Sequence, residues 1–476
     1  MNSKILLPLV KKTVAISTAV ACTVATLGLA NTAEAKVAKR QKTSSNSQSS
    51  AIRVNPKNLR IRLLNGDTSI MLGLNQLYMS KVQVASSQAA LLPSLNLTAA
   101  LGPSFLISSF TVLLPFLLPS NWANLSASEA NLAATGYGYY ALELNEMANV
   151  YAIYEAIVND MDIRDAYVKV YNNYNEIYTV TNAQYSAGAA QHSDLKTALT
   201  NVTNAQGLVR HADEIIAQEL SQIRLILGIP DLDAKFEFDR EHMAKLNAEG
   251  LSAQTILNST YFKSPERDQM LSLIKAAQSQ KISAAFSFLN NAAVSFAPSA
   301  GGGVSSFNSP QGGVGAGLSF TIFPLVNQAQ LQIEQYQIRL KQVRLQEGQL
   351  VESSLHSTRD AVAQVDYYTQ AMNAADAAFA DIMTAYRIGT ATLDHADLAN
   401  NAVQTATLNL AAAQLDLDGQ RVTLARELIV GQYAAIHGCH VGSSSAGNPV
   451  VGFFSDVAGI FALGANKVSI DQVCKN

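Results

Sequence analysis

The side chains best suited to covalent or metal chemistry lie near the C-terminus. Cys439 and Cys474 are the only cysteines beyond residue 22, and His437 and His440 flank the first of them. In an exported protein, which the N-terminal signal described below predicts, two cysteines favour a disulfide. The spacing His437-Gly438-Cys439-His440 matches no standard zinc pattern. We therefore expect a disulfide between Cys439 and Cys474, with a metal site as the weaker alternative.

No arrangement of residues indicates catalysis. The seven histidines are scattered, and no serine or aspartate lies in a nucleophile elbow. The glycines at 313, 315 and 317 lie between predicted strands and do not open a helix, so they are not a dinucleotide fingerprint. A formal charge of −3 gives no basis for binding nucleic acid. We predict no enzyme activity, no cofactor and no nucleic-acid partner.

Two similar turns divide the chain. Tyr185 stands three residues before Gly188, and Tyr386-Arg387-Ile388 precedes Gly389 in the same way. Long segments almost free of glycine and proline flank each turn, which is typical of helices. Gly188 and Gly389 are therefore predicted to be the turns of two antiparallel helical hairpins.

Further landmarks recur in the same order, which indicates a duplicated chain. The run from Leu225 to Gly228 reappears at 428–431, and the run from Phe110 to Pro115 reappears at 320–324. We predict a first repeat at residues 55–228, a connecting equatorial segment at 229–263 and a second repeat at 264–431. In each repeat, one long helix pairs with two short helices. Five tyrosines at nearly heptad spacing predict a coiled-coil seam on the first long helix: Tyr167, Tyr171, Tyr174, Tyr178 and Tyr185.

The two ends of the chain read differently from the repeats. Three lysines, an apolar run and Ala33-Glu34-Ala35 indicate a signal peptide at residues 1–35, so the protein is predicted to be exported. Lipidation at Cys22 is the alternative. Residues 36–54 are polar and predict a disordered leader, with a strand-bearing linker as the other reading. A Gly- and Ser-rich tail covers residues 432–476, and the sequence assigns it no role.

Short extended runs interrupt the helical pattern in both repeats. Residues 95–101 alternate apolar and polar side chains, and further runs follow at 105–114, 293–297 and 318–323. Four strands cannot close a barrel within one chain, but three chains supply twelve, an even number typical of outer-membrane barrels. The predicted fold is mainly α, with duplicated hairpins forming a coiled-coil α-barrel and a membrane β-barrel part closed in a homotrimer.

These motifs occur in the same order in both repeats, and together they resemble those of a known protein family. Residues 68–431 resemble the TolC-like outer-membrane efflux and secretion channels in the Ala90-Leu91-Leu92-Pro93-Ser94-Leu95 entry to a strand, the two Tyr-x-x-Gly turns and the Leu-rich stretches before Gly228 and Gly431. The resemblance implies a homotrimer in the outer membrane of a Gram-negative bacterium that extends into the periplasm. It implies a periplasmic tip that docks a membrane-fusion adaptor through Tyr185, Gly188, Tyr386, Arg387 and Gly389.

The resemblance also implies a channel entrance lined by acidic residues, for which Asp194, Asp394 and Asp397 are the candidates. His395 occupies the place equivalent to Asp194, so Asp394 and Asp397 are each displaced from it on the helix. The implied function is passive conduction as the outer duct of a tripartite pump or type I secretion system, with an inner-membrane transporter as partner. The alternative is a periplasmic or surface coiled-coil scaffold without a pore.

Overall fold

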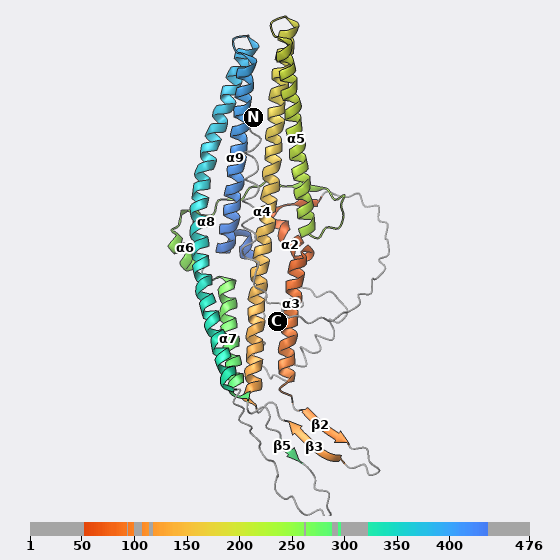
Figure 1. The fold of residues 1–476 in the computed structure, drawn as a ribbon, viewed down its shortest axis with the longest axis vertical. Coiled ribbons are helices and arrows are strands. Elements are labelled where there is room, and N and C mark those ends of the chain that lie inside the picture. The colour runs from red at the N-terminus through yellow and green to blue at the C-terminus, as the bar shows by residue number, and fades with distance from the viewer. Residues whose placement is uncertain are drawn as a thin grey trace, which may run out of the picture. The chain divides into compact units, whose positions relative to one another are not determined.

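A computed structural model describes residues 52–92, 94–99, 107–113, 118–260, 263–287, 294–296 and 322–436. Its α-helices and most of its strands are labelled in Figure 1. The predicted signal peptide, Cys22, and the cysteines and histidines of the tail at 437, 439, 440 and 474 lie outside the described residues. The disulfide, the lipidation and the cleavage site therefore stay predictions.

Two long helical hairpins dominate the structure, as the glycine turns predict. Helix α4 (Pro119–Ser186) pairs with α5 (His192–Ile226), and α8 (Ile322–Arg387) pairs with α9 (Leu393–Leu428) (Figure 1). Pro119 is the first residue of α4, where the missing N–H costs no helical hydrogen bond. Each hairpin turns at a glycine of positive φ, 75° at Gly188 and 81° at Gly389, a conformation that L side chains rarely adopt.

Two shorter helices complete the long ones. Helix α3 (Thr68–Ala89, 22 residues) packs on α4, and α7 (Pro265–Ala285, 21 residues) packs on both α4 and α8. Together with the 35 residues of α5 and the 36 of α9, they cover most of α4 and α8, which have 68 and 66 residues. Helices α4 and α9 also pack on each other, which joins the two repeats.

A three-stranded sheet is formed by segments that lie between α3 and α4 and between α7 and α8 in the sequence. Strands β2 (Ser94–Ala99) and β3 (Ile107–Leu113) are antiparallel, and β5 (Val294–Phe296) from the second repeat pairs with the other edge of β3. Sheet pairing thus crosses between the repeats. The predicted strand at 318–323 is wrong at its end, since Ile322 and Phe323 begin α8. Pro324 follows in the first helical turn, where proline is tolerated.

The connecting segment contacts the long helices α4 and α8 and also α9. It contains β4 (Phe236–Phe238), the 3-10 turn η2 (Asn247–Gly250) and α6 (Ala253–Thr260). Strand β4 pairs in parallel with β1 (Ile52–Val54), which leads directly into α2 (Pro56–Gly66). Of the two alternatives predicted for residues 36–54, the strand-bearing linker agrees with the structure at residues 52–54, where β4 supplies the backbone hydrogen-bond partners.

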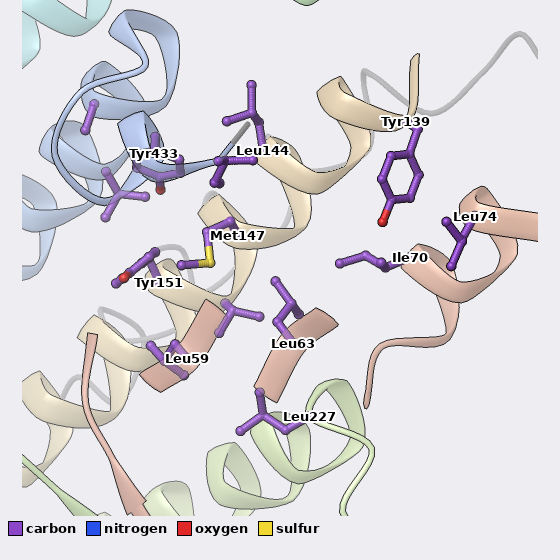
Figure 2. Close-up of a cluster of buried hydrophobic side chains, with 14 of the residues drawn as sticks. Leu59, Leu63, Ile70, Leu74, Tyr139, Leu144, Met147, Tyr151, Leu227 and Tyr433 are labelled. Carbon is purple, nitrogen blue, oxygen red and sulfur yellow. The ribbon is translucent and has the colours of Figure 1, made fainter. Parts of the chain in front are cut away.

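The largest hydrophobic cluster lies where α2, α3, α4 and the end of α5 meet. Figure 2 shows Leu59 and Leu63 of α2 facing Met147 and Tyr151 of α4, with Leu227 beside them. The 3-10 turn η4 (Gly431–Ala435) adds Tyr433, which is 0% exposed. The predicted tail boundary at residue 432 thus falls inside a core element, because Tyr433 packs against Tyr151, with ring centroids 6.0 Å apart.

The predicted coiled-coil seam and the buried stripe of α4 share Tyr174 and otherwise contain different residues. Tyr174 is buried as expected, but Tyr185 is 40% exposed, and the residues buried beside Tyr174 are Val170, Ile177 and Thr181. These four follow the heptad spacing of a seam. None of the helices in the described residues is both long and apolar enough to cross a membrane.

Candidate functional site

The candidate site is the pair of hairpin turns around Gly188 and Gly389, which we call the tip. A Cβ added at either glycine would meet nothing within 4 Å. The backbone N–H of Ala189 donates to the Gln184 carbonyl (2.8 Å), and that of Thr390 donates to the Ala385 carbonyl (2.9 Å). Both turns thus close in the same way and leave their glycines open to any docking molecule.

The equivalent tyrosines of the two turns have different surroundings. Tyr386 is 3% exposed, and its hydroxyl is hydrogen-bonded to that of Thr181 at 2.7 Å. Tyr185 is 40% exposed and packs its ring on His192, with centroids 5.6 Å apart. Tyr386 therefore holds the hairpins together, while Tyr185 remains available at the surface.

Further polar contacts join the two hairpins at the tip. Gln184 Nε2 donates to the Tyr386 carbonyl (2.9 Å), and Arg387 forms an ion pair with Glu176 of α4. Thr181, Gln184 and Glu176 were not predicted as site residues. They carry no turn or motif signal, and only their contact with α8 gives them a role.

A hydrophobic cluster formed by α4, α8 and α9 lies beside these polar contacts. Ile177 of α4, Met383 and Phe379 of α8 and Ala396 of α9 belong to one buried cluster. Polar pairs continue it along α4 and α9, where Asn173 Nδ2 donates to Asn400 Oδ1 at 2.8 Å. The two hairpins of one chain are thus packed together through both apolar and polar contacts.

The three acidic candidates have three different environments. Asp194 caps α5, since its carboxylate accepts from the Gln191 N–H at 3.2 Å. Asp394 is exposed in the first turn of α9. Asp397 is half-buried and accepts from Asn201 Nδ2 at 2.8 Å. Asp194 is therefore a helix cap, and of the three only Asp394 presents an exposed carboxylate.

Burial raises the pKa of Asp397 to about 6 from an ordinary value of 3.8; the Asn201 hydrogen bond opposes this shift and the charge of Asp394 adds to it. The folded chain therefore holds a proton there that the unfolded chain releases. Stability contributed by that proton is present at pH values near 4 and is lost as the pH rises through about 6.

Replacing Asp397 with asparagine should remove this dependence, because an amide accepts the Asn201 bond without a buried charge. We expect Asp397→Asn to have a higher thermal midpoint than the wild type at pH 7.5. Its midpoint should rise less than that of the wild type when the pH is lowered to 5. Thermal unfolding in detergent at several pH values measures both. Asp381→Asn, an exposed position on α8, is the matched control. Parallel pH profiles for wild type and Asp397→Asn would contradict the assignment.

The fold has solved counterparts, although no family model and no curated protein matches the sequence. The outer membrane protein VceC from Vibrio cholerae is 14% identical (TM-score 0.62), over 79% of this chain and 96% of that chain. The Campylobacter jejuni CmeC outer membrane channel is 14% identical (TM-score 0.61), over 90% and 97%. The open state of the Neisseria gonorrhoeae MtrE outer membrane channel is 17% identical (TM-score 0.59), over 78% and 88%.

These matches extend over nearly the whole of each solved chain, so they include both hairpins and not a single helical pair. At 14–17% identity they establish architecture. The resemblance inferred from the duplicated motifs is confirmed at that level: the chain has the fold of the TolC-like outer-membrane channels.

Proposed function

We propose that this chain is the outer-membrane channel of a tripartite efflux pump or type I secretion system in a Gram-negative bacterium. Conduction would be passive, with energy supplied by an inner-membrane transporter. The observation that carries the proposal is the length of α4. Its 68 residues separate strand β3 from the turn at Gly188 by roughly 100 Å of helix. Such a helix allows one chain to place strands in the outer membrane and turns deep in the periplasm.

The open edges of the sheet support assembly with further copies. Strands β2 and β5 each have one edge that no strand of the described residues covers. Uncovered edges in a membrane require partners, because lipid offers no hydrogen bonds. A homotrimer would supply them by closing the predicted twelve-stranded barrel, with outer-membrane lipid around it.

The tip is the proposed docking surface for the adaptor. Gly188 and Gly389 leave open space around their turns, and Tyr185 is exposed beside them. Arg387 adds a charged side chain that is 56% exposed although it pairs with Glu176. A helical hairpin of an adaptor could approach the turns closely where no Cβ intervenes.

Single-channel recording of the detergent-purified protein in planar bilayers tests this function. We expect a trimeric mass and small, mostly closed, cation-preferring conductance events. Acidic side chains near a constriction favour cations, and Asp394 is the exposed candidate. Asp394→Asn should therefore lower the cation preference and leave the trimer intact.

Asp416→Asn on the same helix is the matched control, since it is exposed and lies 22 residues further along α9 from Asp394. A well-folded protein that gives no conductance and fractionates away from the outer membrane would favour the scaffold. Unchanged selectivity in Asp394→Asn would remove that residue from the entrance.

A further inference from the structure

Four ionisable side chains meet far from the tip, and we call them the equatorial cluster. Glu155 and Asp162 belong to α4, Asp418 belongs to α9, and His242 lies in the connecting segment between β4 and η2. His242 Nδ1 is 2.9 Å from Asp418 Oδ2 and 3.8 Å from Glu155 Oε2. His242 Nε2 is 3.3 Å from Asp162 Oδ2. One imidazole thus lies between carboxylates on two helices.

Two carboxylate oxygens in this cluster are buried without a hydrogen-bond partner. Glu155 is 2% exposed and Asp418 is 1% exposed. Within the described part of the chain, Glu155 Oε2 and Asp418 Oδ1 find no donor. Carboxylate oxygens removed from water are costly unless a donor or a cation satisfies them. His242 Nδ1 and Gln414 Nε2, which donates at 3.2 Å, both contact the other oxygen of Asp418, Oδ2, so neither satisfies Oδ1.

The spacing of the ligand atoms fits a metal ion. One ligand atom each from Glu155, His242 and Asp418 can be chosen so that all lie within 4.8 Å of one another. Ion-to-ligand distances of about 2.0–2.2 Å for zinc place neighbouring ligands about 3–3.5 Å apart. The distances from His242 Nδ1 to Asp418 Oδ2 (2.9 Å) and to Glu155 Oε2 (3.8 Å) bracket that range.

Asp162 completes the arrangement on the far side of the imidazole. When Nε2 carries the proton and donates to Asp162, Nδ1 presents its lone pair toward Glu155 and Asp418. Metal-ligating histidines usually donate their second N–H to a carboxylate in this way. Arg240 holds Asp162 in turn, with its Nη1 3.3 Å from Asp162 Oδ1.

We propose that Glu155, His242 and Asp418 bind one divalent transition-metal ion of the zinc type, with Asp162 as the residue that positions His242. Two carboxylates and one imidazole suit such an ion better than Mg²⁺ or Ca²⁺, which prefer more oxygen ligands. The ion would neutralise the two buried carboxylates. Because its ligands come from α4, α9 and the connecting segment, it would fasten that segment to both repeats.

Zinc titration of the full-length protein, purified without a histidine tag, tests the site. We expect calorimetry at pH 7.5 to give one zinc ion per chain. His242→Ala should weaken binding by at least about tenfold, and Asp162→Asn by about 10- to 100-fold. His211→Ala is the control, because His211 is 66% exposed and lies 3.9 Å from a single carboxylate, Glu214. The wild-type affinity should survive in that variant.

A second measurement separates ligand loss from misfolding. Zinc should raise the thermal midpoint of the wild type and of His211→Ala but not that of Asp418→Asn, which preserves side-chain shape. The double variant His437→Ala, His440→Ala should still bind, which excludes the tail as the source. Absence of wild-type binding at about a hundredfold excess of zinc over protein, or full binding by His242→Ala, would overturn the proposal. Channel conductance does not enter either readout.

Discussion

Replacing Gly389 with tryptophan should abolish transport and leave a folded, assembled protein. The space around Gly389 is open within 4 Å, so the indole would project from the turn without a clash inside the chain. A positive φ of 81° strains any other residue by about 1–2 kcal/mol, a small cost beside the packing of α8 on α9. An indole at the turn would prevent the close approach of an adaptor hairpin.

Two matched variants isolate the bulk of the side chain as the cause. Gly389→Ala carries the same backbone strain with little bulk, and Gly207→Trp adds the same bulk on α5 where nothing lies within 4 Å. Expressed in a deletion strain, both controls should restore resistance to transported compounds. Gly389→Trp should leave the strain as susceptible as the deletion. Wild-type resistance in Gly389→Trp would reduce Gly389 to a helix terminator.

Replacing Gly66 with alanine should destabilise the middle of the protein severely. A Cβ at Gly66, the last residue of α2, would lie 1.9 Å from the Leu227 carbonyl oxygen. The backbone approach is reciprocal, since a Cβ at Gly228 would lie 2.4 Å from the Gly66 carbonyl oxygen. Backbone atoms cannot rotate away as a side chain can, so α2 and the end of α5 must separate. We expect a loss of about 3 kcal/mol or more.

Gly207→Ala is the control for the same chemical change without the contact. Gly207 lies within α5 with open space around it, so alanine should stabilise the helix by up to about 1 kcal/mol. Thermal unfolding in detergent and limited proteolysis near residue 228 measure both variants. Equal thermal midpoints for Gly66→Ala and the wild type would show that the close approach of Gly66 to Leu227 and Gly228 is not required for stability.

The parts of the fold that the sequence predicts correctly depend on local signals. The glycines at 188, 228, 389 and 431 all have positive φ, and their repeated positions were sufficient to place both hairpins. The lengths of α3 and α7 follow because Pro93 and Pro265 limit them locally. The tyrosine stripe was predicted to be the buried face of α4, but it is not. Spacing gives the period of a buried seam, whereas several faces of the same helix can share that period. Val170 and Ile177 share that period with Tyr174 and are the residues that are buried.

Features that depend on distant contacts could not be predicted in this way. Strand β1 exists because β4 lies beside it, although 181 residues separate Val54 from Phe236 in the chain. His242 meets Asp418 across 176 residues, and no periodicity connects them. The capping role of Asp194 is a local feature, and it was not predicted either, because Asp194 was expected to line a channel entrance. Its place three residues after Gln191 is a capping-box spacing that the sequence already contained.

The ties between Thr181 and Tyr386 and between Glu176 and Arg387 have a consequence for motion in an assembled ring. In a ring of three chains, each hairpin has one neighbour from its own chain and one from the next. Bonds and a shared core already join the first kind of neighbour. Widening of the proposed trimeric ring would then move the two hairpins of each chain together as one rigid unit, and the contacts that change would be the three interfaces between chains. The six hairpins would not move independently. Threefold symmetry would be preserved only if all three interfaces between chains opened at the same time.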